Sequence, residues 1–113
     1  MYSEYLRERE NKEILEDERG FAIYGYNCVP GVDFPHCYLQ DVYVRPEWRK
    51  RGHASKLADQ ISAQAKAAGF KVLISSVDCS ARGAHESLQV LIAYGMQLFT
   101  AHDGAIFFSK EIS

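Results

Sequence analysis

The clearest pattern along the chain is a run of apolar positions three and four residues apart. It lies within residues 51–68 and consists of Ala54, Leu57, Ala58, Ile61, Ala65 and Ala68. Residues at this spacing share one face of an α-helix. Gly69 is suited to end such a helix, because glycine adopts the left-handed conformation without strain. The pattern therefore predicts an amphipathic helix whose apolar stripe packs against a sheet.

Strands are expected on both sides of this helix. Residues 71–77 form a continuous apolar run, typical of a strand that is buried on both faces. Residues 37–44 divide by the two-residue period of a strand into two sets. One face would carry Leu39, Asp41 and Tyr43, and the other Tyr38, Gln40, Val42 and Val44. Strand, helix and strand in this order predict a parallel βαβ unit.

The two ends of the chain favour antiparallel hairpins. Residues 14–15 and 21–26 are apolar segments separated by Arg19-Gly20, and residues 98–112 alternate around Asp103-Gly104, a dipeptide suited to a tight turn. A second helix is expected over residues 86–94. Its apolar face would carry Leu88, Leu91 and Ile92. The charged residues before the first hairpin are expected to form a short helix or an arm.

Length and composition indicate one domain that spans residues 1–113. The chain is 47% hydrophobic, 25% charged and carries a net charge of −2, which gives no global attraction to nucleic acid or to an anionic membrane. No apolar run approaches the ~20 residues of a membrane span, and the start of the chain lacks the apolar core of a signal peptide. We therefore expect a cytoplasmic protein. The three cysteines, Cys28, Cys37 and Cys79, have no metal-ligand spacing and are expected to be reduced and mostly buried.

Positive charge is concentrated just before the long helix. Residues 45–57 contain one acid, Glu47, and five basic residues: Arg45, Arg49, Lys50, Arg51 and Lys56. The first N–H groups of a helix have no partner within it, and the helix dipole adds positive charge there, so this turn could bind a phosphate. The alternative is a basic turn that is only solvated, and the spacing alone does not separate the two.

The same turn resembles the acyl-CoA signature of the Gcn5-related N-acetyltransferase (GNAT) superfamily, Arg/Gln-x-x-Gly-x-Gly/Ala. Arg49, Gly52 and Ala54 stand at the marked positions, and residues 42–48 are similar to the strand and Val-x-Pro-Glu-aromatic segment before it. The resemblance covers about residues 14–112 and implies a single-domain α/β (α+β) fold. In that fold, antiparallel N-terminal strands, a parallel βαβ unit and a C-terminal hairpin share a mixed central sheet. The region before the first hairpin is short for the family.

The resemblance also implies a set of site residues and a co-substrate, acetyl-CoA, with no metal. Backbone N–H groups of residues 51–54 would bind the pyrophosphate, Lys50 or Arg51 would reach the terminal phosphates, and the strand backbone would pair with the pantetheine arm. The implied cofactor-binding residues are Val42, Val44, Arg49, Lys50, Arg51, Gly52, His53 and Ala54. The side chain of His53 is expected to project into solvent.

The catalytic residues follow less directly. Family members often carry a proton-donating tyrosine where this chain has Leu91, and an asparagine where it has Ala84. Tyr94 is the nearest substitute acid, with packing at a helix end as the alternative. Residues 38–41 are similar to the Tyr-Leu-Glu-Asp strand of spermidine/spermine acetyltransferases. Asp41 is therefore the candidate to bind an ammonium or accept its proton, with an ordinary ion pair as the alternative.

Two functions remain open at this point. The first is an N-acetyltransferase that moves an acetyl group from acetyl-CoA to an amine, which could be a polyamine-like molecule, a protein lysine or a protein N-terminus. The second is an acyl-CoA-binding regulatory or interaction module with little or no transfer, consistent with Leu91 and Ala84. Nucleic-acid binding is disfavoured because the chain is acidic overall. Family members often form dimers, so a second copy of the chain is a candidate partner.

Overall fold

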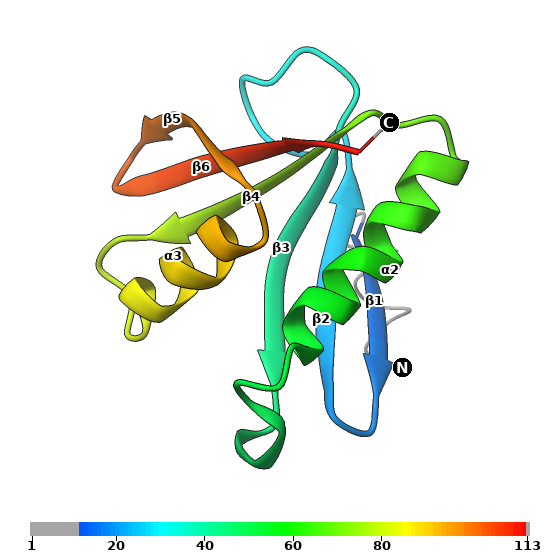
Figure 1. Ribbon diagram of the computed structural model, residues 1–113. Helices are drawn as coiled ribbons and strands as arrows, with labels where there is room; N and C mark the ends of the chain where they lie inside the picture. Colours follow the sequence, from blue (N-terminus) through cyan, green and yellow to red (C-terminus); the bar gives the residue numbers. More distant parts are fainter. Residues whose placement is uncertain (1–11, 113) are drawn as a thin grey trace.

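The computed structural model describes residues 12–112, in which six strands form one sheet and two α-helices cover it (Figure 1). The strands are β1 (Lys12–Asp17), β2 (Gly20–Tyr26), β3 (Cys37–Val44), β4 (Val72–Asp78), β5 (Gln97–His102) and β6 (Ala105–Glu111). The helices are α2 (His53–Ala67) and α3 (Ala84–Ala93), and a 3-10 turn, η2 (Pro46–Trp48), precedes α2. The expected N-terminal helix or arm falls largely on residues outside the described range.

The sheet has the order β1-β2-β3-β4-β6-β5 and is mixed. Strands β3 and β4 run parallel, joined through α2, while the pairs β1 with β2, β2 with β3, β4 with β6 and β5 with β6 are antiparallel. This arrangement confirms the predicted mixed sheet, the βαβ unit and the C-terminal hairpin. Neither described helix is long and apolar enough to cross a membrane.

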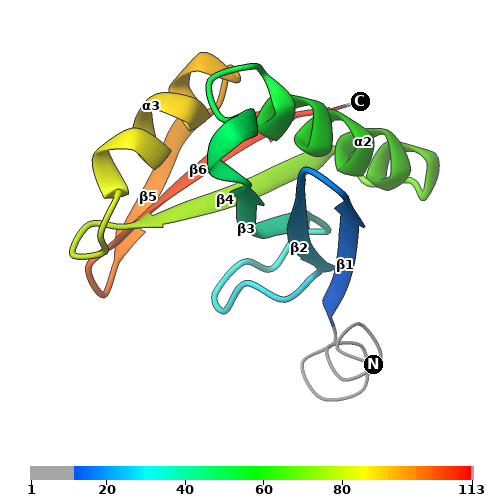
Figure 2. The ribbon, with the colours of Figure 1, turned by 90° about the horizontal axis from the view of Figure 1, so that it is seen from below.

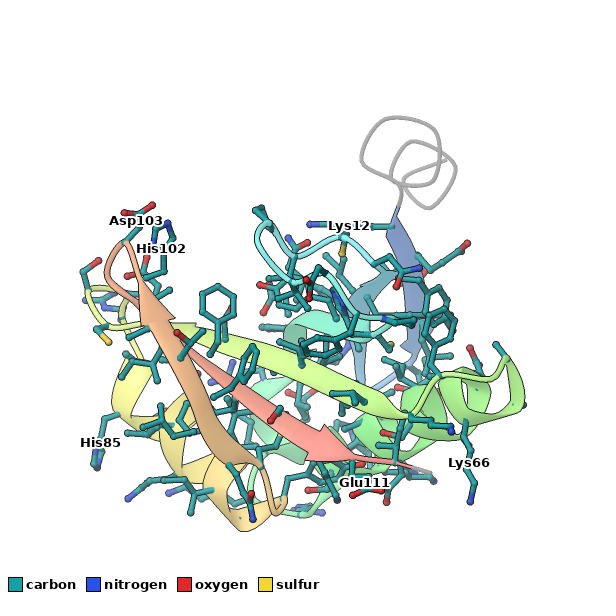
Figure 3. The ribbon with its side chains drawn as sticks, turned by 90° about the horizontal axis from the view of Figure 1, so that it is seen from above. Lys12, Lys66, His85, His102, Asp103 and Glu111 are labelled. Carbon is teal, nitrogen blue, oxygen red and sulfur yellow. The ribbon has the colours of Figure 1, made fainter. Side chains whose placement is uncertain are left out.

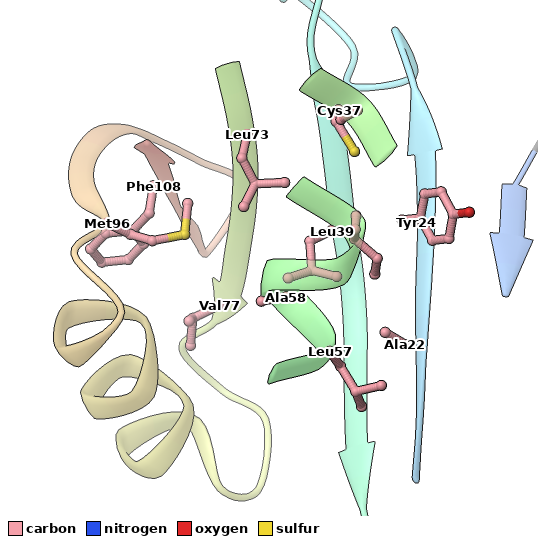
Figure 4. Close-up of a cluster of buried hydrophobic side chains, with 12 residues drawn as sticks. Ala22, Tyr24, Cys37, Leu39, Leu57, Ala58, Leu73, Val77, Met96 and Phe108 are labelled. Carbon is pink, nitrogen blue, oxygen red and sulfur yellow. The ribbon is translucent and has the colours of Figure 1, made fainter. Parts of the chain in front are cut away.

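Both helices lie on the same face of the sheet (Figure 2). The stripe of α2 buries Leu57, Ile61 and Ala65 against the inner face, where β2, β3 and β4 contribute residues such as Leu39 and Leu73 (Figure 4). Burying a side chain such as Leu57 or Ile61 stabilises the fold by about 1.5–3 kcal/mol. The apolar periodicity of residues 51–68 therefore fixes which side of α2 faces the sheet.

Helix α3 is held less tightly than α2. It has no fully buried residue, and its inner stripe is formed by the half-buried Ala84, Leu88 and Leu91. The prediction that Ile92 shares this stripe is wrong, since 58% of its surface is exposed. The stripe is narrow, so a residue 100° away from Leu91 already points outward.

Strands β3 and β4 separate soon after they meet. Their pairing covers Cys37 with Leu73, Tyr38 with Ile74 and Leu39 with Ser75, whereas β3 continues to Val44. The remaining residues of β3 have no strand partner on the side that faces β4. The sheet is therefore open at its centre, beside the start of α2.

A bulge at Gln40 corrects the predicted faces of β3. In the register with β2, Tyr24 pairs with Leu39 and Ile23 with Asp41, so Gln40 is the extra residue. An extra residue shifts the alternation by one. As a result, Val42 and Val44 share the inner, core-facing side with Leu39, while Asp41 and Tyr43 lie on the outer side with Tyr38.

The cysteines are free thiols, but their environments differ. Cys37 is buried on β3, and burial raises its pKa to about 12. Cys28 is half-buried and Cys79 is exposed, so the expectation of mostly buried thiols holds fully only for Cys37. Cys79 is exposed because it follows the end of β4, in the turn that leads to α3.

Candidate functional site

A cavity of about 510 Å³ occupies the opening between β3 and β4. One wall is the end of β3, from Leu39 to Val44, and the floor includes Ser75 and Ser76 of β4. The start of α2 contributes Ala54, Ser55 and Ala58, and α3 forms the opposite wall with residues that include Ser87 and Leu91. The parted strands and the two helices thus enclose this cavity.

The N-terminus of α2 opens onto this cavity with free backbone donors. Gly52, the residue before the helix, has φ 78°, and no side chain caps the helix. The first hydrogen bond of the helix runs from the N–H of Lys56 to the carbonyl of Gly52, at 3.1 Å. The N–H groups of residues 52–55 therefore have no acceptor within the helix. Together with the helix dipole they form a site suited to a phosphate or pyrophosphate.

The basic side chains of the preceding turn are partly engaged with their neighbours. Arg49 lines the cavity, and its Nε donates to the carbonyl oxygen of Val44 at 2.9 Å. The guanidinium of Arg51 lies 5.4 Å from the ring centre of Trp48, a cation–π contact. Lys50 is exposed and has φ 62°, so the chain turns sharply there. Arg51 and Lys50 remain close to the helix start, where the resemblance places terminal phosphates.

The side chain of His53 points inward, which contradicts the expectation that it projects into solvent. It is 6% exposed, and its Nε2 lies 2.9 Å from a carboxylate oxygen of Asp17, the last residue of β1. The backbone N–H of Arg19, with that of Gly20 and the His53 contact, holds the pKa of the Asp17 carboxyl below its usual range. His53 therefore anchors the helix start to the β1–β2 turn, and only its backbone N–H is available to a ligand.

The free edge of β3 offers hydrogen bonds along the cavity. The N–H of Arg45 donates to the carbonyl of Arg19 on the β2 side, at 2.7 Å. Because successive peptide groups of a strand alternate in direction, the peptide groups of Val42 and Val44 face the other side, where β4 has already turned away. An extended ligand could pair with them as an additional strand would.

The two predicted catalytic residues lie in different surroundings. Asp41 lines the cavity and is exposed. The hydroxyl of Tyr94 instead donates to Asp59 of α2 at 2.6 Å, and the ammonium of Lys110 lies 3.8 Å from its ring centre. Burial is the larger cause and the hydrogen bond to Asp59 the next; together they raise the pKa of Tyr94 to about 12. Asp41 therefore lies at the cavity, whereas the Tyr94 hydroxyl is hydrogen-bonded to Asp59 of α2.

The structure adds cavity residues that sequence reasoning missed. Arg82 and Gly83 lie at the start of α3, where Gly83 adopts φ 81° before an uncapped helix, as Gly52 does before α2. The pair Arg82-Gly83 repeats the pair Arg51-Gly52, which is a signal that the sequence did contain. Glu86 and Gln40 also line the cavity. No pattern in the sequence marked Gln40 as a bulge. Within residues 12–112, no cluster of His, Cys, Asp and Glu side chains could hold a metal ion.

Comparison with solved structures shows that this fold is shared with acetyltransferases. A GNAT-family protein from Desulfovibrio desulfuricans is 18% identical with a TM-score of 0.75, over 97% of this chain and 76% of that one. An N-acetyltransferase from Staphylococcus aureus is 20% identical with a TM-score of 0.64, over 95% and 72% of the two chains. An aminoglycoside N-acetyltransferase in complex with CoA is 24% identical with a TM-score of 0.64, over 75% and 56%. In several further structures the chain spans 40% to 64% of the length.

The fold is thus shared with structures of the GNAT family. The profile of the Acetyltransferase (GNAT) family matches residues 2–89, and the chain belongs to this family, whose members are acyl-CoA N-acyltransferases. No curated protein sequence matches the chain significantly.

Proposed function

We propose that this protein is an acetyl-CoA-dependent N-acetyltransferase that transfers the acetyl group directly to an amine. The observation that carries the proposal is the cavity between β3 and β4. Uncapped N–H groups at the start of α2 lie at its edge, and the part of β3 that has no strand partner on the β4 side, at Val42 and Val44, runs along its wall. A diphosphate followed by an extended amide-containing arm, as in CoA, fits these two features together.

The residues of the cavity have distinct roles in this proposal. The N–H groups of Arg51, Gly52, His53 and Ala54 bind the pyrophosphate, while Lys50 and Arg51 approach the terminal phosphates. Arg49 holds the end of β3 through the Val44 carbonyl, which keeps the strand edge in place. A backbone N–H near Val42 would donate to the thioester carbonyl oxygen, where negative charge develops during transfer.

Proton transfer depends on Asp41 and the leaving thiolate. Asp41 lines the cavity, and its carboxylate, on the outer side of β3, could bind an ammonium group or accept its proton through water. The thiolate needs a proton as it leaves, and Leu91, which lines the cavity at the family's tyrosine position, cannot supply one. Tyr94 could serve only after its hydroxyl leaves Asp59. Water is therefore the simplest donor, and slow transfer is expected.

A second function follows from the same observation. A protein with Leu91 in the cavity and the Tyr94 hydroxyl bound to Asp59 could bind acyl-CoA as a regulatory or interaction module without transferring the acyl group. Both functions use the same cofactor site. The two functions differ in whether the bound acyl group is transferred to an amine.

Release of free thiol from acetyl-CoA separates the two functions. The assay would use spermidine, a lysine-containing peptide, a peptide with a free N-terminus and an aminoglycoside as acceptors, with thermal stabilisation by CoA measured alongside. Amine-dependent thiol release supports the transferase. Stabilisation by CoA without release for any amine supports the module, and the absence of both would contradict acyl-CoA binding itself.

A further inference from the structure

One lysine on the edge strand β1 reaches with its side chain to Gln40, a residue of β3 that lines the cavity. Lys12, the first residue of β1, is aligned across the sheet with Gly25 of β2, and Gly25 is aligned with Tyr38 of β3. Gly25 has no side chain, so nothing from β2 stands between Lys12 and β3 at this level. The Lys12 side chain extends from β1 across the sheet (Figure 3), and its Nζ donates to Oε1 of Gln40 on β3.

The surroundings of this ammonium are those of a binding site for a primary amine. Its Nζ lies 5.7 Å from the centre of the Tyr38 ring, a cation–π contact, and the Tyr38 hydroxyl is fixed by Oγ of Ser76 at 2.7 Å. Gln40 is the bulged residue of β3, directly before Asp41, and both residues line the cavity. The ammonium is thus held one side chain away from the opening between β3 and β4.

The other fixed lysine in the described part of the chain provides a contrast. Lys110 of β6 donates to the carbonyl of Tyr94 at 2.9 Å and lies over the Tyr94 ring. It is also near a cavity residue, but at the end of α3, and it has no contact with β3. Of these two lysines, Lys12 is the one hydrogen-bonded to the strand whose free edge would pair with the acyl-CoA arm.

We propose that Lys12 is an internal acceptor, so that the protein acetylates its own Lys12 side chain from acetyl-CoA. The inference rests on the proposed acyl-CoA site. It adds a modification site and names the acceptor class as a lysine-type primary amine on an extended segment.

The reaction balances with the groups that are present and the thioester. The ammonium of Lys12 gives up a proton through water to Asp41, and the neutral nitrogen attacks the thioester carbonyl carbon. The N–C bond forms, the nitrogen gives its second proton to water, the C–S bond breaks, and the leaving thiolate takes up a proton from water. The products are Nε-acetyl-lysine and free CoA. Gln40 orients the nitrogen through its side-chain carbonyl, and acetylation removes the charge that holds Lys12 over Tyr38.

The test follows acetyl incorporation into the purified chain by intact mass and peptide mapping after addition of acetyl-CoA. Lys12 should be acetylated about tenfold or more faster than Lys110, because its amine is held against Gln40, which lines the cavity. The rate constant should not change with protein concentration, since the reaction is intramolecular. Denatured protein serves as the control for chemical acetylation, and in it Lys12 and Lys110 should be acetylated at similar rates. The matched variants are Lys12→Arg and Lys110→Arg, which keep the charge.

The outcomes separate this inference from the proposed function. Loss of the fast acetylation in Lys12→Arg but not in Lys110→Arg supports it. If CoA stabilises the folded protein and Lys12 reacts no faster than Lys110, or at a rate that rises with protein concentration, the internal acceptor is overturned and the acyl-CoA site stands. If CoA gives no stabilisation and no lysine reacts faster in the folded than in the denatured protein, both proposals fail.

Discussion

A negative charge placed at the start of α2 should abolish CoA binding without unfolding the protein. Ala54 is the second residue of α2, is half-buried and lines the cavity. A glutamate there should support the helix itself, because a carboxylate in the first turn interacts favourably with the helix dipole. Position 52 is less suitable, since Gly52 has φ 78° and any side chain there would strain the backbone. The perturbation is therefore Ala54→Glu, with the uncharged Ala54→Gln as its control.

The expected loss follows from the distance between the new carboxylate and the phosphate. At about 6 Å and an effective dielectric constant of about 20, two unit negative charges repel by about 3 kcal/mol. That energy weakens binding about 100-fold. At a CoA concentration about 100 times the wild-type Kd, ligand stabilisation falls from about 2.7 kcal/mol to about 0.4 kcal/mol in the variant.

Thermal unfolding with and without CoA measures this difference. For a chain of this length, the shift in Tm should fall from about 10 °C in the wild-type protein to about 2 °C in Ala54→Glu. Ala54→Gln has a side chain of the same length without the charge and should keep most of the shift. An undiminished shift in Ala54→Glu would refute the assignment of the α2 N-terminus, and an equal loss in both variants would point to bulk rather than charge.

Three further predictions concern the missing proton donor at position 91, the hydroxyl of Tyr94 and the carboxylate of Asp17. Leu91→Tyr, which places a phenol in the cavity, should raise the rate of thiol release by about 10²-fold with unchanged CoA affinity; an unchanged rate would contradict the need for an acid. Burial and its hydrogen bond raise the pKa of Tyr94 to about 12. Wild-type stability should therefore fall as the pH rises from 10 to 12, and denaturant titrations should show a smaller fall in Tyr94→Phe. The pKa of Asp17 is lowered, so the stability it contributes should disappear as the pH falls below 3.8, and Asp17→Asn should show less acid destabilisation.

The elements that depend on local spacing were predictable from the sequence. The α2 helix follows from apolar residues such as Leu57 and Ile61, because only a helical period brings them to one face. The turn with Arg49 and Gly52 directly precedes α2, as the sequence predicted, while its role in binding a phosphate stays a prediction. The order of strands and helices then followed from the chain itself, since a parallel pair needs a crossover helix.

The features that depend on distant contacts were not predictable. The bulge at Gln40 arises from pairing between β2 and β3, and it moved Asp41 and Val42 to faces opposite to those expected. The His53 side chain turns inward because it is hydrogen-bonded to Asp17, 36 positions earlier in the chain. The Tyr94 hydroxyl donates a hydrogen bond to the carboxylate of Asp59 on another helix, and no spacing around Tyr94 in the sequence indicates this partner. Each of these contacts is set by the tertiary structure and not by the local pattern.

A crystal structure with bound CoA is the most direct test of the central claim, that the open centre of the sheet is an acyl-CoA site. The pyrophosphate should accept hydrogen bonds from the N–H groups of residues 51–54, and the pantetheine arm should pair with the backbone of Val42 and Val44. A pyrophosphate bound away from the start of α2, or an arm that does not enter the gap between β3 and β4, would contradict it.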